Sequence, residues 1–164
     1  MSKLIVLSGV PGSGKSYFST LLRKKKGSHV YIISSDGLRD LITGSQKNIS
    51  EDKLVWKMFY DLALIYAQDK KGIVVLDATN RSVQFRVEQV RKVAESFDEV
   101  DMVLFEVPRE KVLLQNKVRD FPIPEDVLEE YFREFQLPQK EDYEFFDHIH
   151  IVTADNLFEI VDKY

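Results

Sequence analysis

The feature that most constrains the fold lies near the N-terminus, where an apolar run leads directly into a glycine-rich loop. Residues 4–8 read LIVLS, and the pattern G-x-x-x-x-G-K-S extends from Gly9 to Ser16. Glycine adopts backbone angles that other residues avoid, so successive N–H groups of such a loop can surround a polyphosphate. The helix that follows adds the positive end of its dipole. The pattern therefore predicts a strand, a phosphate-binding loop and a helix, and with them a nucleotide-binding protein.

Each residue in the second half of this loop has an expected task. We expect Gly12, Ser13 and Gly14 to bind the phosphates of ATP. Lys15 is expected to reach the β- and γ-phosphates, and the Ser16 hydroxyl to ligate Mg²⁺. The alternative is a glycine-rich turn that contains a lysine by chance. The strand before the loop and the amphipathic stretch after it favour the phosphate-binding interpretation.

Size and composition narrow the class of protein. A chain of 164 residues is long enough to bury a sizeable core, and we predict one domain over residues 1–164. No apolar stretch approaches a membrane span, no signal peptide precedes the first strand, and cysteine is absent, so we expect a cytoplasmic protein. The net charge of −4 argues against coating nucleic acid by charge alone but permits a local basic groove. The number of subunits stays open.

Short β-branched runs alternate with helical stretches, which predicts parallel strands with helices on both faces of the sheet. The expected strands are residues 3–7, 30–33, 73–76, 102–107 and 148–152. The expected helices are residues 15–25, 37–43, 51–70, 82–97, 110–119, 124–134 and 156–162. The predicted fold class is α/β, a P-loop three-layer sandwich with a central, mostly parallel five-stranded sheet and a helical lid at about 109–126.

Ligands of open parallel sheets gather at the carboxyl ends of the strands. After the second expected strand come Asp36 and Arg39, spaced to share one face of a helix. An acid beside the phosphate-binding loop can accept the proton of an attacking hydroxyl, and Arg39 can hold the reacting phosphate. A capping aspartate with a local ion pair would produce the same spacing.

The third expected strand ends in an acid, Asp77, as in the second nucleotide-binding motif of phosphate-loop proteins, whose carboxylate orients Mg²⁺ or its waters. Thr79 and Asn80 follow it, and we include them among the substrate-binding residues. A strand-terminal turn would also use these residue types. Arg86 belongs to a group of basic side chains that could line a local groove, and we assign it to the substrate as well.

A basic segment follows the fourth expected strand and lies between Pro108 and Pro122. Prolines on both sides indicate a helix that stops and a hinged connection, as in a lid that closes over ATP. Arg119 in this segment could stabilise charge on a transferring phosphoryl group. Taken alone, an arginine here would more often be a solvated surface residue.

Four sequence elements occur in order along the chain. They are the phosphate-binding loop, DGLR at residues 36–39, DATN at 77–80, and NKVR at 116–119 followed by PIPEDVL at 122–128. In this order they resemble the 5′-kinase domain of the phage polynucleotide kinase family, and the resemblance extends to residue 147. It implies transfer of the γ-phosphate of ATP, with Mg²⁺, to the 5′-hydroxyl of DNA or RNA in nucleic-acid end repair. The D-x-D-G-T signature of a phosphatase domain is absent, so no 3′-phosphatase activity is expected.

The resemblance also implies a role for each matching residue. The lysine and serine of the phosphate-binding loop would hold ATP and Mg²⁺. Asp36 would be the general base for the 5′-hydroxyl, and Arg39 would engage the phosphate at the receiving site. Asp77 would support the active site, and Arg119 in the lid would contact the ATP phosphates. Gln115 departs from the pattern, because some relatives have arginine there, so the lid would hold ATP differently.

Two other functions fit the same sequence. One is a kinase of a small molecule such as a nucleoside, a sugar or an antibiotic, since one fold hosts many acceptors. The other is a nucleotide-binding module that catalyses no transfer. A screen of hydroxyl acceptors distinguishes the three.

Overall fold

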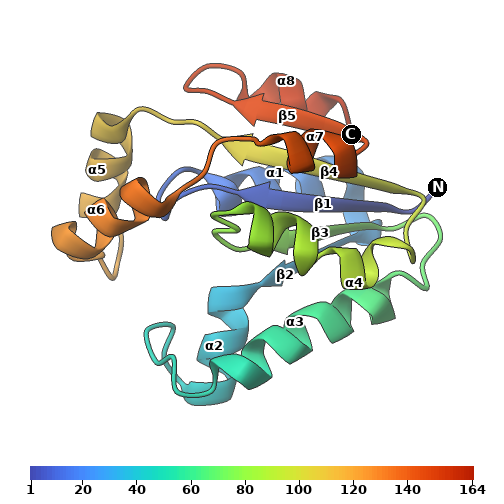
Figure 1. Cartoon of the computed structure of the whole chain (residues 1–164), viewed down its shortest axis with the longest axis horizontal. Coiled ribbons are helices and arrows are strands. Elements are labelled where there is room, and N and C mark those ends of the chain that lie inside the picture. The colour runs from blue at the N-terminus through green and yellow to red at the C-terminus, as the bar shows by residue number, and fades with distance from the viewer.

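The computed structural model describes residues 1–164 and has a five-stranded sheet of order β2–β3–β1–β4–β5, in which every neighbouring pair is parallel (Figure 1). The strands are β1 (Lys3–Ser8), β2 (Val30–Ser34), β3 (Ile73–Asp77), β4 (Glu99–Phe105) and β5 (His148–Val152). The α-helices are α1 (Lys15–Lys26), α2 (Ser35–Thr43), α3 (Asp52–Tyr66), α4 (Arg91–Ala94), α5 (Arg109–Lys117), α6 (Glu125–Glu134), α7 (Lys140–Phe145) and α8 (Leu157–Asp162). The predicted α/β class is confirmed, with a sheet that is parallel throughout.

Successive residues of the central strand β1 enter two separate cores. Leu4 and Val6 pack in one core with residues of α3 such as Phe59, whereas Ile5 and Leu7 pack in the other with residues of α1 and α8. Both faces of the sheet are therefore covered by helices, which makes three layers. A strand buried on both faces needs an unbroken apolar run, and this explains the sequence that leads into the glycine-rich loop.

All strands end at the same edge of the sheet, and α5 and α6 lie beyond that edge (Figure 1). A small third core joins them to the glycine-rich loop: Val10 of the loop packs with Val112 of α5 and Leu128 of α6. Helix α2 begins directly at the end of β2. The glycine-rich loop, the start of α2 and the helices α5 and α6 thus meet at one edge of the sheet.

The helix predicted over residues 82–97 is wrong as one continuous element. A five-residue π-turn, Gln84–Glu88, is followed by the short helix α4. The wider turn contains the fully buried Arg86, and hydrophobic spacing does not reveal a turn of this width. Helix α7 was not expected at all, and β4 begins three residues before its predicted start. None of the helices has the length and apolar composition that a membrane-spanning helix requires.

Candidate active site

The loop after β1 depends on glycine at three positions. Gly12 and Gly14 have φ angles of 81° and 107°, where L side chains are strained. A Cβ atom on Gly9 would come within 2.6 Å of Ser13 Oγ and 2.9 Å of Phe105 Cβ. The Ser13 hydroxyl is itself buried without a hydrogen-bond partner. Since buried polar groups are normally paired, this unpartnered hydroxyl fits a loop built to receive the oxygen atoms of a ligand.

Lys15 is held inside this loop. Its buried ammonium donates to the carbonyl oxygens of Gly9 and Val10, at 2.8 and 3.0 Å. Burial lowers the pKa of Lys15 to about 8; Asp77 and Asp36 oppose the shift, and the positive charge of Arg119 adds to it. Groups from the ends of β1, β2 and β3 and from the segment after α5 therefore act on one ammonium.

Ser16 and Asp77 form the next pair of the site. The exposed Ser16 hydroxyl donates to Asp77 Oδ2 at 3.0 Å. Burial raises the pKa of Asp77, and the charge of Lys15 and the hydrogen bond from Ser16 oppose that rise. A hydroxyl and a carboxylate side by side are oxygen ligands of the kind that Mg²⁺ takes, beside a loop suited to phosphate. The residues present therefore fit a Mg²⁺ ion bridging to a bound polyphosphate.

At the end of β2, Asp36 is not the helix cap that the alternative interpretation of this segment requires. Ser34, rather than Asp36, caps α2 by accepting from the Gly37 N–H at 3.1 Å. The Asp36 carboxylate is consequently free of the cap, and its side chain is 55% exposed. Asp36 therefore remains available to a bound molecule.

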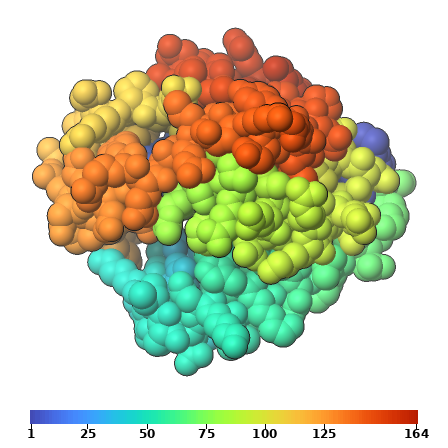
Figure 2. All heavy atoms as spheres, in the orientation of Figure 1, coloured from blue at the N-terminus to red at the C-terminus, as the bar shows by residue number.

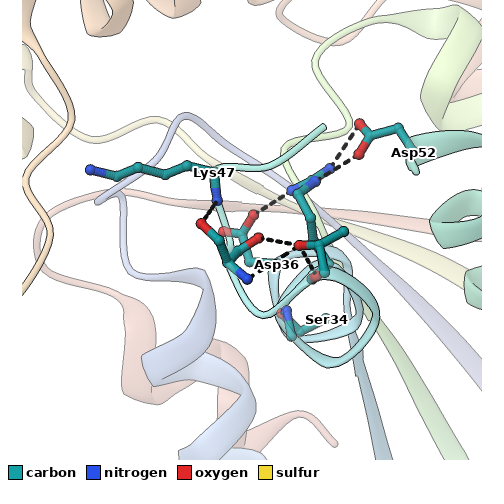
Figure 3. A network of polar contacts seen from close by, with 8 residues as sticks. Ser34, Asp36, Lys47 and Asp52 are labelled. Atoms are coloured by element: carbon teal, nitrogen blue, oxygen red, sulfur yellow. Dashed lines mark hydrogen bonds and ion pairs between the residues drawn. The ribbon is translucent and has the colours of Figure 1, made fainter. Parts of the chain in front are cut away.

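Arg39 is fixed by two carboxylates (Figure 3). Its Nε and Nη2 donate to the two oxygens of Asp52, at 2.8 and 3.1 Å, and its Nη1 donates to Asp36 Oδ1 at 2.8 Å. The hydrogen bonds to Asp52 raise the pKa of Arg39, so the guanidinium stays charged. Sequence analysis missed Asp52, because it lies 13 residues away on another helix and no local pattern signals the pair.

The segment after α5 is closed into a loop by one side chain. Asn116 Nδ2 donates to the Ile123 carbonyl at 2.8 Å, and the Ile123 N–H donates back to Asn116 Oδ1 at 2.9 Å. The loop between them carries Arg119, which is half-buried. The buried Asn116 amide thus sets the position of the arginine that acts on Lys15.

Arg86, which we expected to bind the substrate, is held inside the protein by other partners. Its side chain is fully buried in an ion pair with Asp142 at 2.8 Å, and it also donates to the backbone carbonyls of Gln136 and Leu137. With all of these partners inside the protein, the guanidinium has no donor left for a substrate. Asp142 lies 56 residues away on the unexpected helix α7, so local spacing could not reveal the pair.

Thr79 and Asn80 hold the loop after β3 to the loop after β1. The buried Asn80 has a φ of 43°, and its amide donates to the Leu7 carbonyl at 2.7 Å. The Gly9 N–H donates to the Thr79 carbonyl at 3.0 Å. The Asn80 side chain therefore holds the two loops together, while the half-buried Thr79 side chain forms no hydrogen bond within the protein.

Two pockets adjoin these groups. One of about 410 Å³ lies beside Ser13 and Gly14, and the exposed rings of Tyr17 and Phe158 meet edge to face at its wall, with Gln115 also lining it. The other, of about 290 Å³, is lined by Arg81, Val127, Glu130, Tyr131 and Glu134. Tyr131 acts electrostatically on Arg39, so the second pocket lies on the Arg39 side of the site. The first pocket is rimmed by aromatic rings, and the second carries two carboxylates.

Residues 4–138 match the family described as the AAA domain. Kti12 of Chaetomium thermophilum, solved with ADP-AlF3, is 18% identical with a TM-score of 0.72, and the match covers 98% of this chain and 96% of that one. A fungal RNA kinase is 17% identical with a TM-score of 0.70, covering 99% and 82%. A gluconokinase of Sinorhizobium meliloti is 20% identical with a TM-score of 0.65, covering 98% and 88%. At these identities the likeness is one of fold, that of P-loop kinases.

Proposed function

We propose that this chain, which belongs to the AAA domain family, transfers the γ-phosphate of ATP to the 5′-hydroxyl end of DNA or RNA. The observation that carries the proposal is the position of Asp36. This half-exposed carboxylate lies within electrostatic range of Lys15 and Asp77 and is bonded to Arg39. The order of its sequence elements, which resembles phage polynucleotide 5′-kinases, and the fold that it shares with a fungal RNA kinase support a nucleic-acid acceptor.

On the donor side, the loop after β1 would hold the phosphates of ATP. Lys15 would exchange the Gly9 and Val10 carbonyls for the β- and γ-phosphates, and Ser13 would gain the partner that its hydroxyl lacks. Ser16 and Asp77 would hold Mg²⁺, which would neutralise negative charge on the phosphates. The pocket with the Tyr17 ring fits the adenine base.

On the acceptor side, Asp36 would take the proton of the 5′-hydroxyl. Arg39 engages Asp36 Oδ1, which leaves Oδ2 for the hydroxyl. As the proton moves to Asp36, the hydroxyl oxygen forms a bond to the γ-phosphorus. The bond between that phosphorus and the β–γ bridging oxygen breaks, and its electron pair leaves with ADP. The products are a 5′-phosphate end, ADP and a proton, which Asp36 then releases to solvent.

Residues 109–126 would act as a lid over this reaction. Arg119, on the loop that Asn116 closes, would meet the negative charge of the transferring phosphoryl group. Its effect on the pKa of Lys15 supports this placement. In an Arg119→Ala variant, transfer is expected to be slower while the protein stays folded. An unchanged rate would mean that Arg119 is a surface residue without a role in transfer.

The test is transfer of labelled γ-phosphate from Mg·ATP to 5′-hydroxyl DNA and RNA oligonucleotides, beside free nucleosides and sugars. Asp36→Asn is expected to slow transfer on the order of 10²–10⁴-fold while ATP affinity stays the same, because only the proton acceptor is lost. Asp40→Asn, an exposed change on the same helix, is the matched control. Transfer by Asp36→Asn at the wild-type rate would refute the role of Asp36.

A second candidate is a small-molecule kinase, and the pocket near Arg39 is the observation that favours it. Glu130 and Glu134 line this pocket together with Arg81, which pairs with Glu134 at 3.4 Å, and carboxylates and a guanidinium side by side can hydrogen-bond the hydroxyls of a sugar. The same screen separates the candidates. Label on a sugar or free nucleoside, and none on oligonucleotides, identifies the small-molecule kinase; nucleotide binding with no labelled acceptor indicates a binding module.

A further inference from the structure

We propose that Lys47 and Phe121 form a subsite for a single-stranded end of nucleic acid, beside the transfer site. The Phe121 ring would stack on an unpaired base, and the Lys47 ammonium would bind a backbone phosphate. The inference rests on the proposed function, because it specifies the form of the acceptor that the site receives.

These two residues meet across the site from separate segments. Lys47 belongs to the connection between α2 and α3, and Phe121 belongs to the loop between α5 and α6. The Lys47 ammonium lies 5.8 Å from the centre of the Phe121 ring. In Figure 3 the Lys47 side chain extends away from the network of Asp36 and Asp52, and its ammonium has no carboxylate partner. The cation is therefore free of an ion pair and available to an anion.

Phe121 contributes little to the folded core. Its side chain is 70% exposed and is absent from the hydrophobic clusters of the protein. Val118 in the same loop is 84% exposed, and Ile49 on the α2–α3 connection is 71% exposed. A hollow opens on this face between the α2–α3 segment and α6 (Figure 2). Exposed apolar side chains on two loops that meet indicate a surface kept for a ligand rather than for folding.

Both loops are tied to groups of the proposed reaction. The Thr43 hydroxyl lies 2.7 and 2.8 Å from the carbonyl oxygens of Arg39 and Ser45, to which it can donate. The Lys47 N–H donates to Ser45 Oγ at 3.2 Å. Phe121 follows Arg119 by two residues in the loop that Asn116 closes. A strand held by this pair would therefore lie near Arg39, which is hydrogen-bonded to Asp36, and near Arg119.

The chemistry of the pair fits single strands of any sequence. Every base presents a π-face to an aromatic ring, and a neighbouring cation meets the phosphate beside it. In the free protein the Lys47 ammonium lies over the Phe121 ring. Lys47 therefore occupies the face of the ring on which a base would stack. Helix α6 is acidic on its exposed residues, with Glu125, Asp126 and Glu130 among them, so the backbone would pass along the Lys47 side.

The test compares a minimal acceptor with a longer one. A nucleoside 3′-monophosphate offers the 5′-hydroxyl but no second base, whereas single-stranded DNA and RNA 10-mers can reach the subsite. For Phe121→Ala and Lys47→Ala we expect the KM of both 10-mers to rise about tenfold. The kcat, the KM of ATP and the KM of the mononucleotide should change less than twofold. Tyr143→Ala and Lys53→Ala, both at exposed positions on α7 and α3, are the matched controls.

Two further readouts separate stacking from a general effect on the lid. Fluorescence of 2-aminopurine near the 5′ end should be quenched on binding wild type and Phe121→Trp but not Phe121→Ala. Lys47→Ala should reduce the salt dependence of 10-mer binding by about 0.7 in log–log slope, the value for one phosphate contact on a single strand.

The outcomes distinguish failure of this inference from failure of the proposed function. Transfer to 10-mers by wild type with unchanged KM in both variants would overturn the subsite alone. Equal losses for the mononucleotide and the 10-mers would also overturn it, since the contact would then act on lid closure. If the wild-type protein neither binds nor phosphorylates any oligonucleotide, the proposed function is overturned, and the subsite with it.

Discussion

The donor side and the acceptor side of the candidate site are built in different ways. The donor side is centred on one continuous loop, residues 9–16, whose backbone angles and buried Lys15 set its shape, with Asp77 hydrogen-bonded to Ser16 beside it. The acceptor side is assembled from side chains of separate segments: Asp36, Arg39, Asp52 and the lid loop. A backbone cradle tolerates little change, whereas exposed side chains can vary without altering the fold. The difference explains why one fold of this kind serves many acceptors.

The largest expected effect comes from a residue that lies behind both sides. Arg86 bonds to Ser8 at the end of β1, at 3.4 Å, and to Asp142 of α7. Arg86→Met leaves a buried carboxylate unpaired and should lower the free energy of unfolding by about 3–5 kcal/mol, measured by urea denaturation. Arg91→Met, on the exposed face of α4, is the control.

A second variant identifies the cause of that loss. Combining Arg86→Met with Asp142→Leu removes both buried charges and should recover part of the stability. If Arg86→Met instead kept wild-type stability and weakened only the acceptor, Arg86 would belong to the acceptor side after all.

The example of Arg86 shows what sequence could and could not provide. The strand, loop and helix at residues 3–26 were predictable, because hydrophobic runs and glycine spacing are local signals. The parallel five-stranded sheet followed from the alternation of strands and helices. The π-turn at Gln84–Glu88 and the pairing of Arg86 with a residue 56 positions away could not be predicted, because both arise from tertiary packing.

The same limit applied within the site. Asp36, Arg39 and Asp77 were predicted because they lie at or shortly after the carboxyl ends of two strands, β2 and β3. The sequence did not predict that Ser34 caps α2 or that Asp52 binds Arg39. Competing caps and distant partners leave no regular spacing in the sequence. Sequence therefore predicted which residues gather beside the glycine-rich loop, but not the partners that hold Arg39 in place.

The next largest effect is expected from the donor side, when the Lys15 ammonium is removed. Lys15→Met removes the ammonium that the loop encloses, and transfer should slow on the order of 10²–10³-fold while ATP binding weakens. Binding of a 5′-hydroxyl oligonucleotide, measured by fluorescence anisotropy, should not change, because the acceptor side makes no bond to Lys15. Lys24→Met on the exposed face of α1 is the control. Equal weakening of the oligonucleotide would show that the two sides are not independent.

Asp52→Asn should weaken binding of the acceptor and leave binding of ATP unchanged, the reverse of Lys15→Met, with a smaller effect. Arg39 loses the carboxylate that accepts two of its hydrogen bonds, so the KM of the acceptor should rise about tenfold. The KM of ATP should stay the same, because Asp52 has no contact with the loop after β1. Asp61→Asn, exposed on the same helix, provides the comparison. A change in the KM of ATP as large as that of the acceptor would mean that Asp52 supports the fold rather than positions Arg39.

The smallest effect concerns pH and again separates the two sides. Burial lowers the pKa of Lys15 to about 8 in the free protein, whereas bound phosphate favours the charged form. As pH rises through 8 the free lysine loses its proton, so nucleotide binding must take one up and the affinity must fall. Between pH 7.5 and 8.5 the affinity for ADP should drop about threefold, measured by calorimetry in buffers of different ionisation enthalpy.

Oligonucleotide affinity should stay constant over this interval, because the raised pKa of Arg39 keeps its charge. Lys15→Met should bind ADP weakly and without this pH dependence. An ADP affinity that stays level in the wild type would mean that Lys15 remains charged in the free loop, and that burial there is offset by Asp77 and Asp36.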